Sequence, residues 1–393
     1  MSSEKSLTPQ IRFKGFTEAW EQRKFLKIYR KNDERNDDRL SANKTLSVAT
    51  MTFNCGGNGA SDESLPNYKR LRIGDIAFEG HANKEFSFGR FVLNDAGDGI
   101  MSPRFTCLRP ITKQDYSFWK YYIHSEKVMR EKLVNSTKSG TMMNELVVED
   151  FLNESILVPS LEEQREIGFV FKSLTNLITL HQRKLDALKK IKSALLEKMF
   201  PKDGSDIPEI RFAGFTEAWE QRKLKDLFAY GGSGGTPSSN NRDYYNGNIP
   251  FLNISDLKER NIRFTEKQIT TLGLHNSAAW IVPAGSISLA MYASVGKVGI
   301  ICNDTATSQA FYNMVFQDIL VRNFLYTRLE KADFCNEWEP YISTGTQRNL
   351  NAEKVRNFKI NIPSKHEMNQ IGSIFEVLDS LITLHQRKLN EPA

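Results

Sequence analysis

The sequence predicts an α+β protein in which two α/β domains are joined by two long helices that form an antiparallel coiled coil, arranged as a pseudo-twofold internal duplication. Two observations predict this architecture. An apolar seam runs from Leu161 to Met199, and its motif LITLHQRKL, at Leu177–Leu185, recurs unchanged within Ser380–Leu389. A second segment is also repeated, because Pro9–Lys24 (PQIRFKGFTEAWEQRK) and Pro208–Lys223 (PEIRFAGFTEAWEQRK) differ at only two positions. Self-similarity of this kind indicates a duplicated unit.

The seam has apolar residues at alternating spacings of four and three, which is typical of a coiled-coil helix. At about 1.5 Å per residue, the helix from Leu161 to Met199 is about 58 Å long. The two copies of the seam are expected to close on each other. A histidine lies on each, and a polar residue at such a position typically fixes helix register. The seam positions are Ile167, Phe171, Leu174, Ile178, His181 and Leu185 in the first copy, and Ile371, Phe375, Leu378, Ile382, His385 and Leu389 in the second.

Each half of the chain is composed of a short repeated segment, which we call the anchor, then a long insert, then a seam helix. The inserts differ in sequence although the anchors and seams match, so one frame is expected to carry two different binding domains. We expect the limits 1–155 for the first anchor and insert, 156–207 for the central helix and linker, 208–357 for the second anchor and insert, and 358–393 for a short distal helix.

Composition places the chain among ordinary globular proteins, with 40% hydrophobic and 25% charged residues. It has no apolar run of about 18 residues and its N-terminus lacks an apolar signal core, which predicts a cytoplasmic protein. The cysteines Cys55, Cys107, Cys302 and Cys335 lack metal-ligand spacing and are expected to be reduced thiols. The net charge of +6 permits nucleic acid as a partner without requiring it.

In the first half, Phe13, Phe16 and Trp20 of the anchor are expected to dock on the seam helices. The first insert, from about Phe25 to Ser155, combines turn clusters with short apolar runs and predicts an α+β domain. One helix is expected over Ser117–Val134.

In the second half, a Pro/Gly linker at Phe200–Pro208 ends the long helix. The second insert, from about Leu224 to Asn357, is expected to contain a buried strand within Val295–Cys302 and a helix over Phe324–Trp338. Both inserts carry a Gly-Thr turn after their helix, at Gly140-Thr141 and Gly345-Thr346, so they are expected to share a fold.

Some segments resemble cofactor-binding motifs, but the residues around them do not fit those motifs. The glycine-rich Phe228–Gly235 has no apolar strand before it and no helix after it, as a dinucleotide site would require. Gly296-Lys297 lacks the first glycine and the Ser or Thr of a phosphate loop. The six histidines show no zinc-binding spacing, and no methyltransferase or nuclease motif is found. The sequence therefore predicts no catalytic centre and no metal site.

Several motifs occur in an order that resembles the specificity subunit of type I restriction-modification enzymes, over essentially the whole chain. They are GGTPS at Gly234–Ser238 followed by NIPFLNISDL, then PAGSISL…SVGKVGI, STGTQRNL, and LITLHQRKL leading to LLEKMFP. The resemblance implies two target-recognition domains, each reading one half of a bipartite site in double-stranded DNA. It also implies that the conserved helices set the spacer and dock two methyltransferase subunits, which restriction/translocase subunits then join. The distal helix is shorter than is usual in that family.

What the resemblance implies for chemistry is a non-catalytic subunit of a system that defends against foreign DNA. S-adenosylmethionine would be bound by the partner methyltransferase, and ATP and Mg by the partner restriction subunit, with no cofactor in this chain. Two alternatives stay open. A scaffold for protein interactions would need no DNA, and a standalone methyltransferase-nuclease would need the catalytic motifs that are missing.

Candidate DNA contacts combine side chains that can read base edges with side chains suited to phosphates. Asn, Gln and Arg side chains can make bidentate contacts to purines, and Lys, Thr and Ser side chains suit contacts to phosphates. In the second insert the candidates are Thr236, Ser238, Asn240, Asn241, Arg242, Lys297, Thr346, Gln347, Arg348 and Asn349, and in the first they are Lys69, Arg70, Lys84, Arg90, Lys138 and Asn144.

Overall fold

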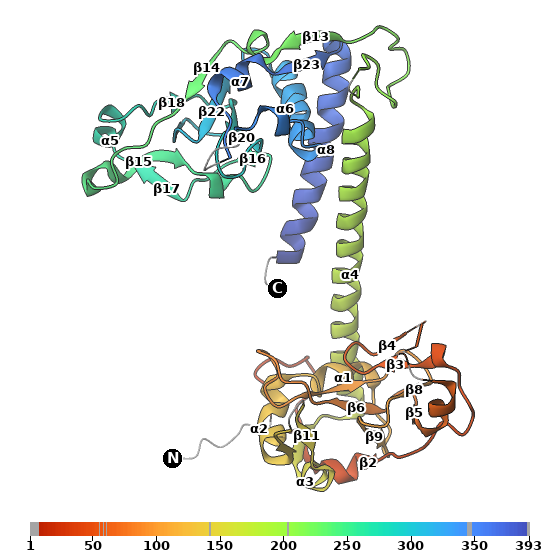
Figure 1. Ribbon diagram of the computed structural model, residues 1–393. Coiled ribbons are helices and arrows are strands. Elements are labelled where there is room, and N and C mark those ends of the chain that lie inside the picture. The colour runs from red at the N-terminus through yellow and green to blue at the C-terminus, as the bar shows by residue number, and fades with distance from the viewer. Residues whose placement is uncertain are drawn as a thin grey trace. The chain divides into compact units, whose positions relative to one another are not determined.

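A computed structural model of the chain describes residues 8–54, 56, 57, 59, 61–140, 143–202, 204–343 and 348–390. The chain divides into two compact units, Met1–Ile178 (unit 1) and Thr179–Ala393 (unit 2). The boundary falls within the helix α4, Leu161–Lys198, so this helix contributes its N-terminal half to unit 1 and its C-terminal half to unit 2 (Figure 1). The seam helix predicted over Leu161–Met199 is confirmed, and it ends one residue earlier than expected.

Unit 1 is built on a four-stranded antiparallel sheet in the order β2-β9-β6-β7. Helices α1 and α2 cover it, and the core between them contains the large rings of Phe25, Tyr29, Phe91, Trp119 and Phe151. The strands are β1 Glu21–Lys24, β2 Tyr29–Lys31, β3 Leu46–Ser47, β4 Thr52–Phe53, β5 Lys69–Leu71, β6 Ile76–Glu79, β7 Arg90–Leu93, β8 Gly99–Met101, β9 Thr106–Pro110, β10 Thr137–Lys138, β11 Glu145–Leu146 and β12 Ser155–Val158, and the helices are α1 Tyr116–Tyr122, α2 Glu126–Ser136 and α3 Val148–Asn153.

The single helix predicted over Ser117–Val134 is wrong, because the structure has two helices there. Helix α1 ends at Tyr122, and Ser125 has an extended backbone with φ −71° and ψ 114° as the N-cap of α2. Serine before a glutamate, here Glu126, is a favourable start for a helix. The apolar periodicity continued across the break and concealed it.

Unit 2 contains a five-stranded sheet in the order β14-β22-β19-β20-β16 and a second sheet in the order β17-β15-β21-β18. Its core joins the strands to α6, α8 and the end of α4. The strands are β13 Glu220–Lys223, β14 Tyr230–Ser233, β15 Tyr245–Leu252, β16 Asn261–Ile262, β17 Lys267–Ile269, β18 Ile281–Val282, β19 Ile287–Ala290, β20 Val298–Ile301, β21 Thr305–Thr307, β22 Phe311–Val315 and β23 Lys359–Ile362, and the helices are α5 Thr271–His275, α6 Ile319–Phe334, α7 Ala352–Asn357 and α8 Lys365–Asn390. The buried strand β20 and the helix α6 overlap the segments predicted for them.

The two inserts share a sheet despite their different sequences. Strand order β2-β9-β6-β7 in unit 1 corresponds to β14-β22-β19-β20 in unit 2, and every pairing is antiparallel. A glycine with positive φ precedes the last strand in both, Gly89 at +84° and Gly296 at +95°. The shared fold predicted from the inserts is thus present in the described strands, and unit 2 adds β16 and a second sheet.

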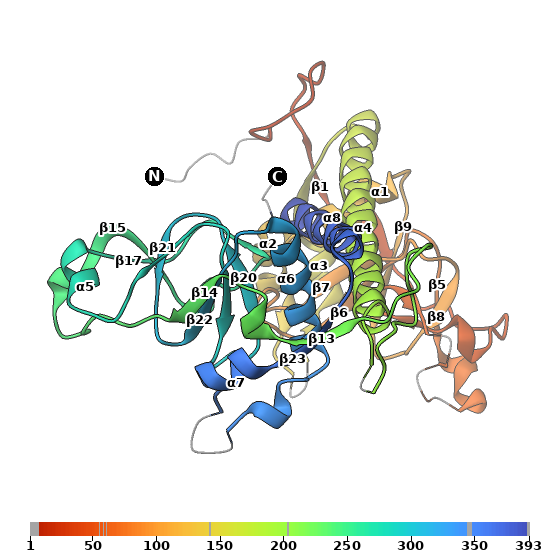
Figure 2. The ribbon, with the colours of Figure 1, turned by 90° about the horizontal axis from the view of Figure 1, so that it is seen from above.

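Helices α4 and α8 pack antiparallel within unit 2. Three contacts establish the direction, because partners on α8 decrease in number as those on the α4 segment increase: His181 meets His385, Lys192 meets Asp379, and Phe200 just beyond α4 meets Phe375. The two helices lie side by side in both views (Figures 1 and 2). The predicted antiparallel helix pair is confirmed.

Candidate nucleic-acid interface

Each anchor closes its insert in the same way. In unit 1, β1 pairs antiparallel with β12, so Lys24 at the start of the insert lies opposite Ser155 at its end. In unit 2, β13 pairs with β23, and Lys223 lies opposite Lys359. The duplicated frame therefore holds the entry and the exit of each insert together.

An ion pair that the sequence reasoning missed ties each anchor to its helix. Arg12 donates to both carboxylate oxygens of Glu163 at 2.7 and 2.8 Å, and Arg211 donates to Glu367 with the same two distances. Both glutamate side chains are 1% exposed. The hydrogen bond to the carboxylate raises the pKa of each arginine. The signal was available, since these residues occupy equivalent positions in both anchors and both helices.

The anchor tryptophans pack mainly on the helices of the inserts, whereas docking on the seam helices was expected. Trp20 makes edge contacts with Phe118 and Tyr122 of α1. Trp219 contacts Phe324 of α6 and Phe200 just beyond α4. A glycine lets each insert helix pack closely against its seam helix, Gly168 of α4 against the start of α1 and Gly372 of α8 against α6. A Cβ atom on Gly168 would lie only 2.5 Å from Asp115.

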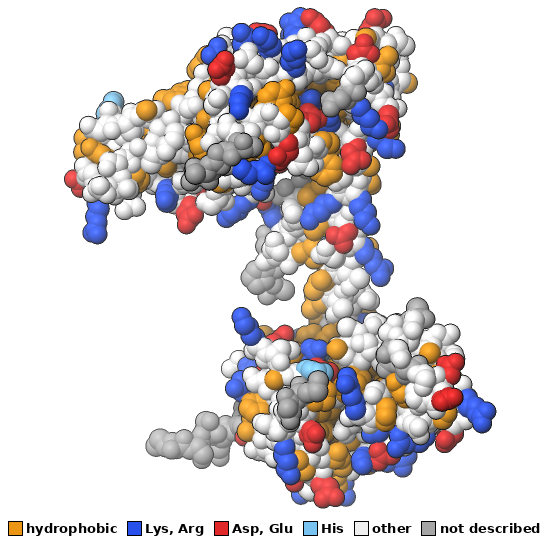
Figure 3. All heavy atoms as spheres, viewed as in Figure 1, with side chains coloured by type: hydrophobic (Ala, Val, Ile, Leu, Met, Phe, Trp, Pro, Cys, Tyr) orange, Lys and Arg blue, Asp and Glu red, His pale blue; other side chains and the backbone are white. Residues whose placement is uncertain are grey.

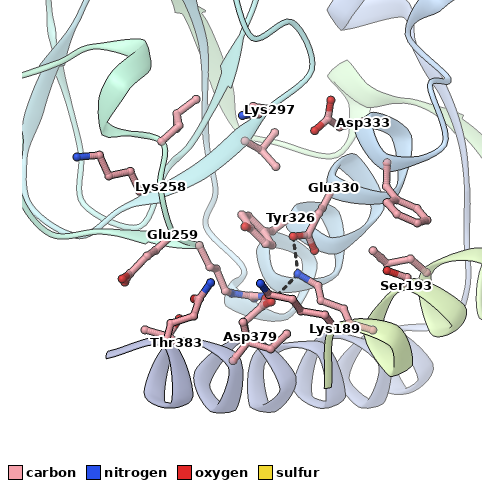
Figure 4. Close-up of a pocket in the computed structure, with 18 residues that line it drawn as sticks. Lys189, Ser193, Lys258, Glu259, Lys297, Tyr326, Glu330, Asp333, Asp379 and Thr383 are labelled. Carbon is pink, nitrogen blue, oxygen red and sulfur yellow. Dashed lines mark hydrogen bonds and ion pairs between the residues drawn. The ribbon is translucent and has the colours of Figure 1, made fainter. Parts of the chain in front are cut away.

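A polar joint in unit 2 connects the two seam helices to the second insert (Figure 4). Lys192 of α4 contacts both Asp379 of α8 and Glu330 of α6. Arg260, which lies just before β16 and has a side chain only 4% exposed, donates to Asp379 at 3.1 Å and lies over the ring of Tyr326. Burial raises the pKa of Glu330. A cavity of about 500 Å³ opens beside this cluster. The joint fixes the insert to both helices.

The seam is more buried on α8 than on the part of α4 that belongs to unit 1. On α8, Ile371, Phe375 and Leu378 are buried, as is Leu185 of α4, while Ile382, His385 and Leu389 are partly exposed. In unit 1, Ile167 packs against the core and Phe171 stacks on Tyr121, yet Phe171, Leu174 and Ile178 are 42–56% exposed. Figure 3 shows hydrophobic side chains along this part of α4. An exposed apolar stretch of this kind marks a surface for protein contact.

The candidates in the second insert fall into two groups. Thr236, Ser238, Asn240, Asn241 and Arg242 lie on the loop between β14 and β15, and all but the half-buried Asn241 are exposed. Two of them already have partners: Thr236 donates to Gln309, and the side chain of Asn241 accepts from the backbone of Asp243.

The second group lies on the turn before β20 and near α7. Lys297 and Arg348 line one hollow of about 260 Å³, together with Asp333 and Glu339, and Arg348 pairs with Glu339. Asn349 bridges to Tyr292 and Ser343 through its backbone. Thr346 and Gln347 lie outside the described residues, as do Thr141, Gly345 and Cys55.

In the first insert, two of the six candidates are buried. Lys69 donates to the backbone of Phe105 at 3.0 Å, and Arg70 pairs with Asp38 and Asp98. Lys84 and Lys138 are exposed. Asn144 donates to the backbone of Ser87.

Arg90 and Lys297, both candidate contacts, occupy equivalent places. Each follows a left-handed glycine at the start of the last shared strand. Arg90 lies opposite Glu79 of β6, whereas Lys297 lies opposite Ala290 of β19. At this position of the shared sheet, unit 1 therefore has an acidic residue opposite the cation, whereas unit 2 has an alanine.

Within the described ranges there is no group of three or more His, Cys, Asp or Glu side chains able to hold a metal ion. None of the helices in the described part of the chain has the length and apolar character that a bilayer span requires.

Residues 34–190 and 216–391 match the family described as "Type I restriction modification DNA specificity domain". The chain belongs to this family. Both matched ranges combine most of one insert with most of one seam helix, so the specificity domain occurs here twice, in step with the internal duplication.

Similar proteins include two specificity subunits of type I restriction enzymes. The chain is 31% identical over 177 residues to the type I restriction enzyme MjaIX specificity subunit of Methanocaldococcus jannaschii, a match covering 44% of this chain and only 40% of that protein. It is 22% identical over 356 residues to the HindI specificity subunit of Haemophilus influenzae, covering 73% of this chain and 77% of that one.

A crystal structure shows that the fold is shared. The type I restriction-modification S subunit from M. genitalium superposes with a TM-score of 0.59 at 13% identity, over 97% of this chain and 95% of that chain. The specificity-domain family therefore accounts for the sheet and helix arrangement of both units.

Proposed function

We propose that this chain is the DNA sequence-recognition subunit of a type I restriction-modification complex, and that each insert reads one half of a bipartite site in double-stranded DNA. The observation that carries the proposal is the double match to the specificity-domain family, once in each half of the duplicated frame. The shared sheet with different side chains at equivalent positions supports two readers of unlike sequence, as the pairs Glu79–Arg90 and Ala290–Lys297 illustrate.

In this proposal the helices α4 and α8 set the distance between the half-sites and dock two methyltransferase subunits, to which restriction/translocase subunits bind. The exposed apolar side chains of α4, including Phe171, Leu174 and Ile178, support a protein partner on this helix. The limits 1–155, 156–207, 208–357 and 358–393 are proposed as the corresponding functional segments.

Catalysis belongs to the partners in this proposal. The methyltransferase would hold S-adenosylmethionine, the restriction subunit would hold ATP and Mg, and this chain would supply specificity to a cytoplasmic defence against foreign DNA. Neither Phe228–Gly235 nor Gly296-Lys297 fits the pattern of a nucleotide-binding loop, which supports assigning the cofactors to the partner subunits.

The test is a gel-retardation experiment with the full chain, purified together with its methyltransferase partner. The complex should retard one bipartite duplex in preference to a scrambled competitor at moderate salt, since phosphate contacts alone weaken with salt and show no preference. Equal retardation of both duplexes would refute the proposal. Methyl transfer by the purified chain without its partner would contradict the assignment of catalysis.

A further inference from the structure

A polar hollow of about 480 Å³ opens on unit 1 next to Arg90, one of the candidate DNA contacts. It is lined by Thr45, Asn54, Glu79, His81, Arg104 and Phe105, among others. These residues come from the β3–β4 hairpin, the end of β6 and the turn before β9, so three separate segments of the first insert converge on it.

A buried carboxylate is fixed beside this hollow. Glu79 is 4% exposed, and its Oε1 accepts from the backbone N–H of His81 at 3.0 Å and contacts the His81 ring. Its Oε2 faces Nε of Arg90 at 3.6 Å, which is an ion pair beyond hydrogen-bond distance. Arg90 in turn donates to the backbone of Ala49 on the wall of the hollow. The carboxylate is therefore oriented by neighbours on two sides.

Two buried polar atoms at this place, in the described part of the chain, make no hydrogen bond. The hydroxyl of Thr45, a residue 2% exposed that lines the hollow, makes no hydrogen bond within the described part of the chain, and neither does Nε of Arg90. Leaving a buried polar group unpaired is costly, so natural proteins usually satisfy such groups. A ligand with hydrogen-bonding atoms in the hollow could satisfy the Thr45 hydroxyl, since Thr45 lines it.

Three cations that rest on aromatic rings lie on the lining of the hollow or next to residues that line it. Lys44 lies over Phe53 at 5.2 Å, Arg90 over Phe86 at 5.0 Å, and Arg104 over Phe105 at 4.8 Å. Ring contacts of this kind hold the charged groups in place, and cations interleaved with aromatic rings suit the phosphates and bases of nucleic acid.

We propose that this hollow is a base-reading site of unit 1, in which Glu79 accepts a hydrogen bond from the exocyclic amino group of adenine or cytosine. An ionised carboxylate only accepts hydrogen bonds, so it favours bases that present an amino group over those that present a carbonyl oxygen. Arg104 and Lys44 hold the adjoining phosphates. The inference rests on the proposed function and assigns a specificity residue to one half of the site. The equivalent position in unit 2 is Ala290, which has no such acceptor.

The experiment uses the full chain in complex with its methyltransferase partner and a set of duplexes in which every base pair of both half-sites is varied in turn. Glu79→Gln replaces one acceptor oxygen with a donor of the same shape. At one base pair of one half-site, the preference for the amino-bearing base should fall about tenfold or move to a carbonyl-bearing base. The other half-site should read as in the wild type. Glu149→Gln changes an exposed carboxylate on α3 of the same unit and serves as the matched control.

A second variant keeps the test decisive if Glu79→Gln folds poorly. Arg104 is exposed, and Arg104→Gln should weaken binding to every duplex and reduce its salt dependence without changing the preferred bases. Wild-type preferences in the folded Glu79→Gln complex, or unaltered affinity and salt dependence for Arg104→Gln, would overturn the base-reading site while the proposed function stands. A wild-type complex with no sequence preference would overturn both.

Discussion

His181 and His385 face each other across the two seam helices with their Nδ1 atoms 2.8 Å apart, although 204 residues separate them in sequence. That separation equals the spacing between the two copies of LITLHQRKL, so the two histidines are equivalent members of the duplication. Equivalent residues can touch only near a twofold axis. A local pseudo-twofold axis of the helix pair therefore passes between these two rings.

This contact predicts a pH dependence of the helix pair. Burial lowers the pKa of His181, and the neighbouring Lys388, His385 and Lys184 lower it further. Above the ordinary pKa of about 6.5 the ring is neutral whether the helices are paired or apart. As the pH falls through that value, the separated state binds the proton first, so the paired state loses stability until the lowered pKa is passed.

We expect thermal unfolding to show a lower Tm at pH 5.5 than at pH 7.5, and the difference should shrink in His181→Gln. His275→Gln, on the exposed surface of α5 in unit 2, should retain the full difference. An equal pH response in wild type and His181→Gln would contradict the prediction.

The paired anchors predict separable effects on the two units. Arg12→Gln should weaken the anchor of unit 1, and Arg211→Gln that of unit 2, because each change leaves a buried glutamate without its partner. Amide hydrogen exchange should then speed up in the β1–β12 ladder for the first variant and in the β13–β23 ladder for the second. Arg23→Gln removes only the exposed pair with Glu21 and should leave both ladders protected. Matching changes in both ladders for either anchor variant would exclude independent frames.

The polar joint predicts a large cost for removing its shared acid. Asp379→Ala would leave Lys192 and Arg260 without the carboxylate that both contact, at a cost of about 3 kcal/mol in the free energy of unfolding of unit 2. Chemical denaturation measures this cost, and Asp186→Asn on the exposed face of α4 supplies a control with little expected change. A loss under about 1 kcal/mol would show that the joint contributes no more than a surface pair.

The proposed spacer role of α4 predicts that helix length sets the gap between half-sites. Leu188, Lys192 and Leu195 are packed in unit 2, so an insertion belongs outside that stretch, and Leu177 and Ile178 are exposed. Four residues added between Asn176 and Leu177 lengthen the helix by about 6 Å, which corresponds to one or two base pairs. A coiled coil accepts four residues as a local unwinding.

The reconstituted complex should then methylate both original half-sites with a longer preferred spacer, measured on duplexes graded one base pair at a time. Adding one or two residues instead should rotate the exposed seam residues of unit 1, such as Phe171 and Leu174, about the helix axis, and should reduce activity on every spacer. An active four-residue variant with the original spacer optimum would exclude the spacer role.

The parts of the fold that were predicted depend on long-range regularity in the sequence. The spacing of the apolar seam residues predicted α4, and the repeated motif LITLHQRKL predicted that α8 is a second copy of it. Local patterns were less reliable, because the break at Ser125 does not interrupt the apolar periodicity. Side-chain environment was the least predictable: Lys69 and Arg70 have the composition of a surface loop, yet they form β5 and are buried against acids and backbone. Glu79 was not predicted as a site residue, because the hollow that it lines is formed together with residues distant in sequence, such as Thr45 and Arg104.

The closed ladders β1–β12 and β13–β23 have a thermodynamic consequence for the frame. Each ladder brings the two ends of an insert together, so the insert closes a loop on the anchor and the seam helix. The entropy cost of closing such a loop grows only with the logarithm of its length. Doubling that loop would cost the frame only about 0.6 kcal/mol. The five extra residues between anchor and seam in the second half are therefore negligible for the frame. A change in the length of either insert therefore costs the frame little by itself, whereas replacing the second insert would also remove its ion pairs with α4 and α8.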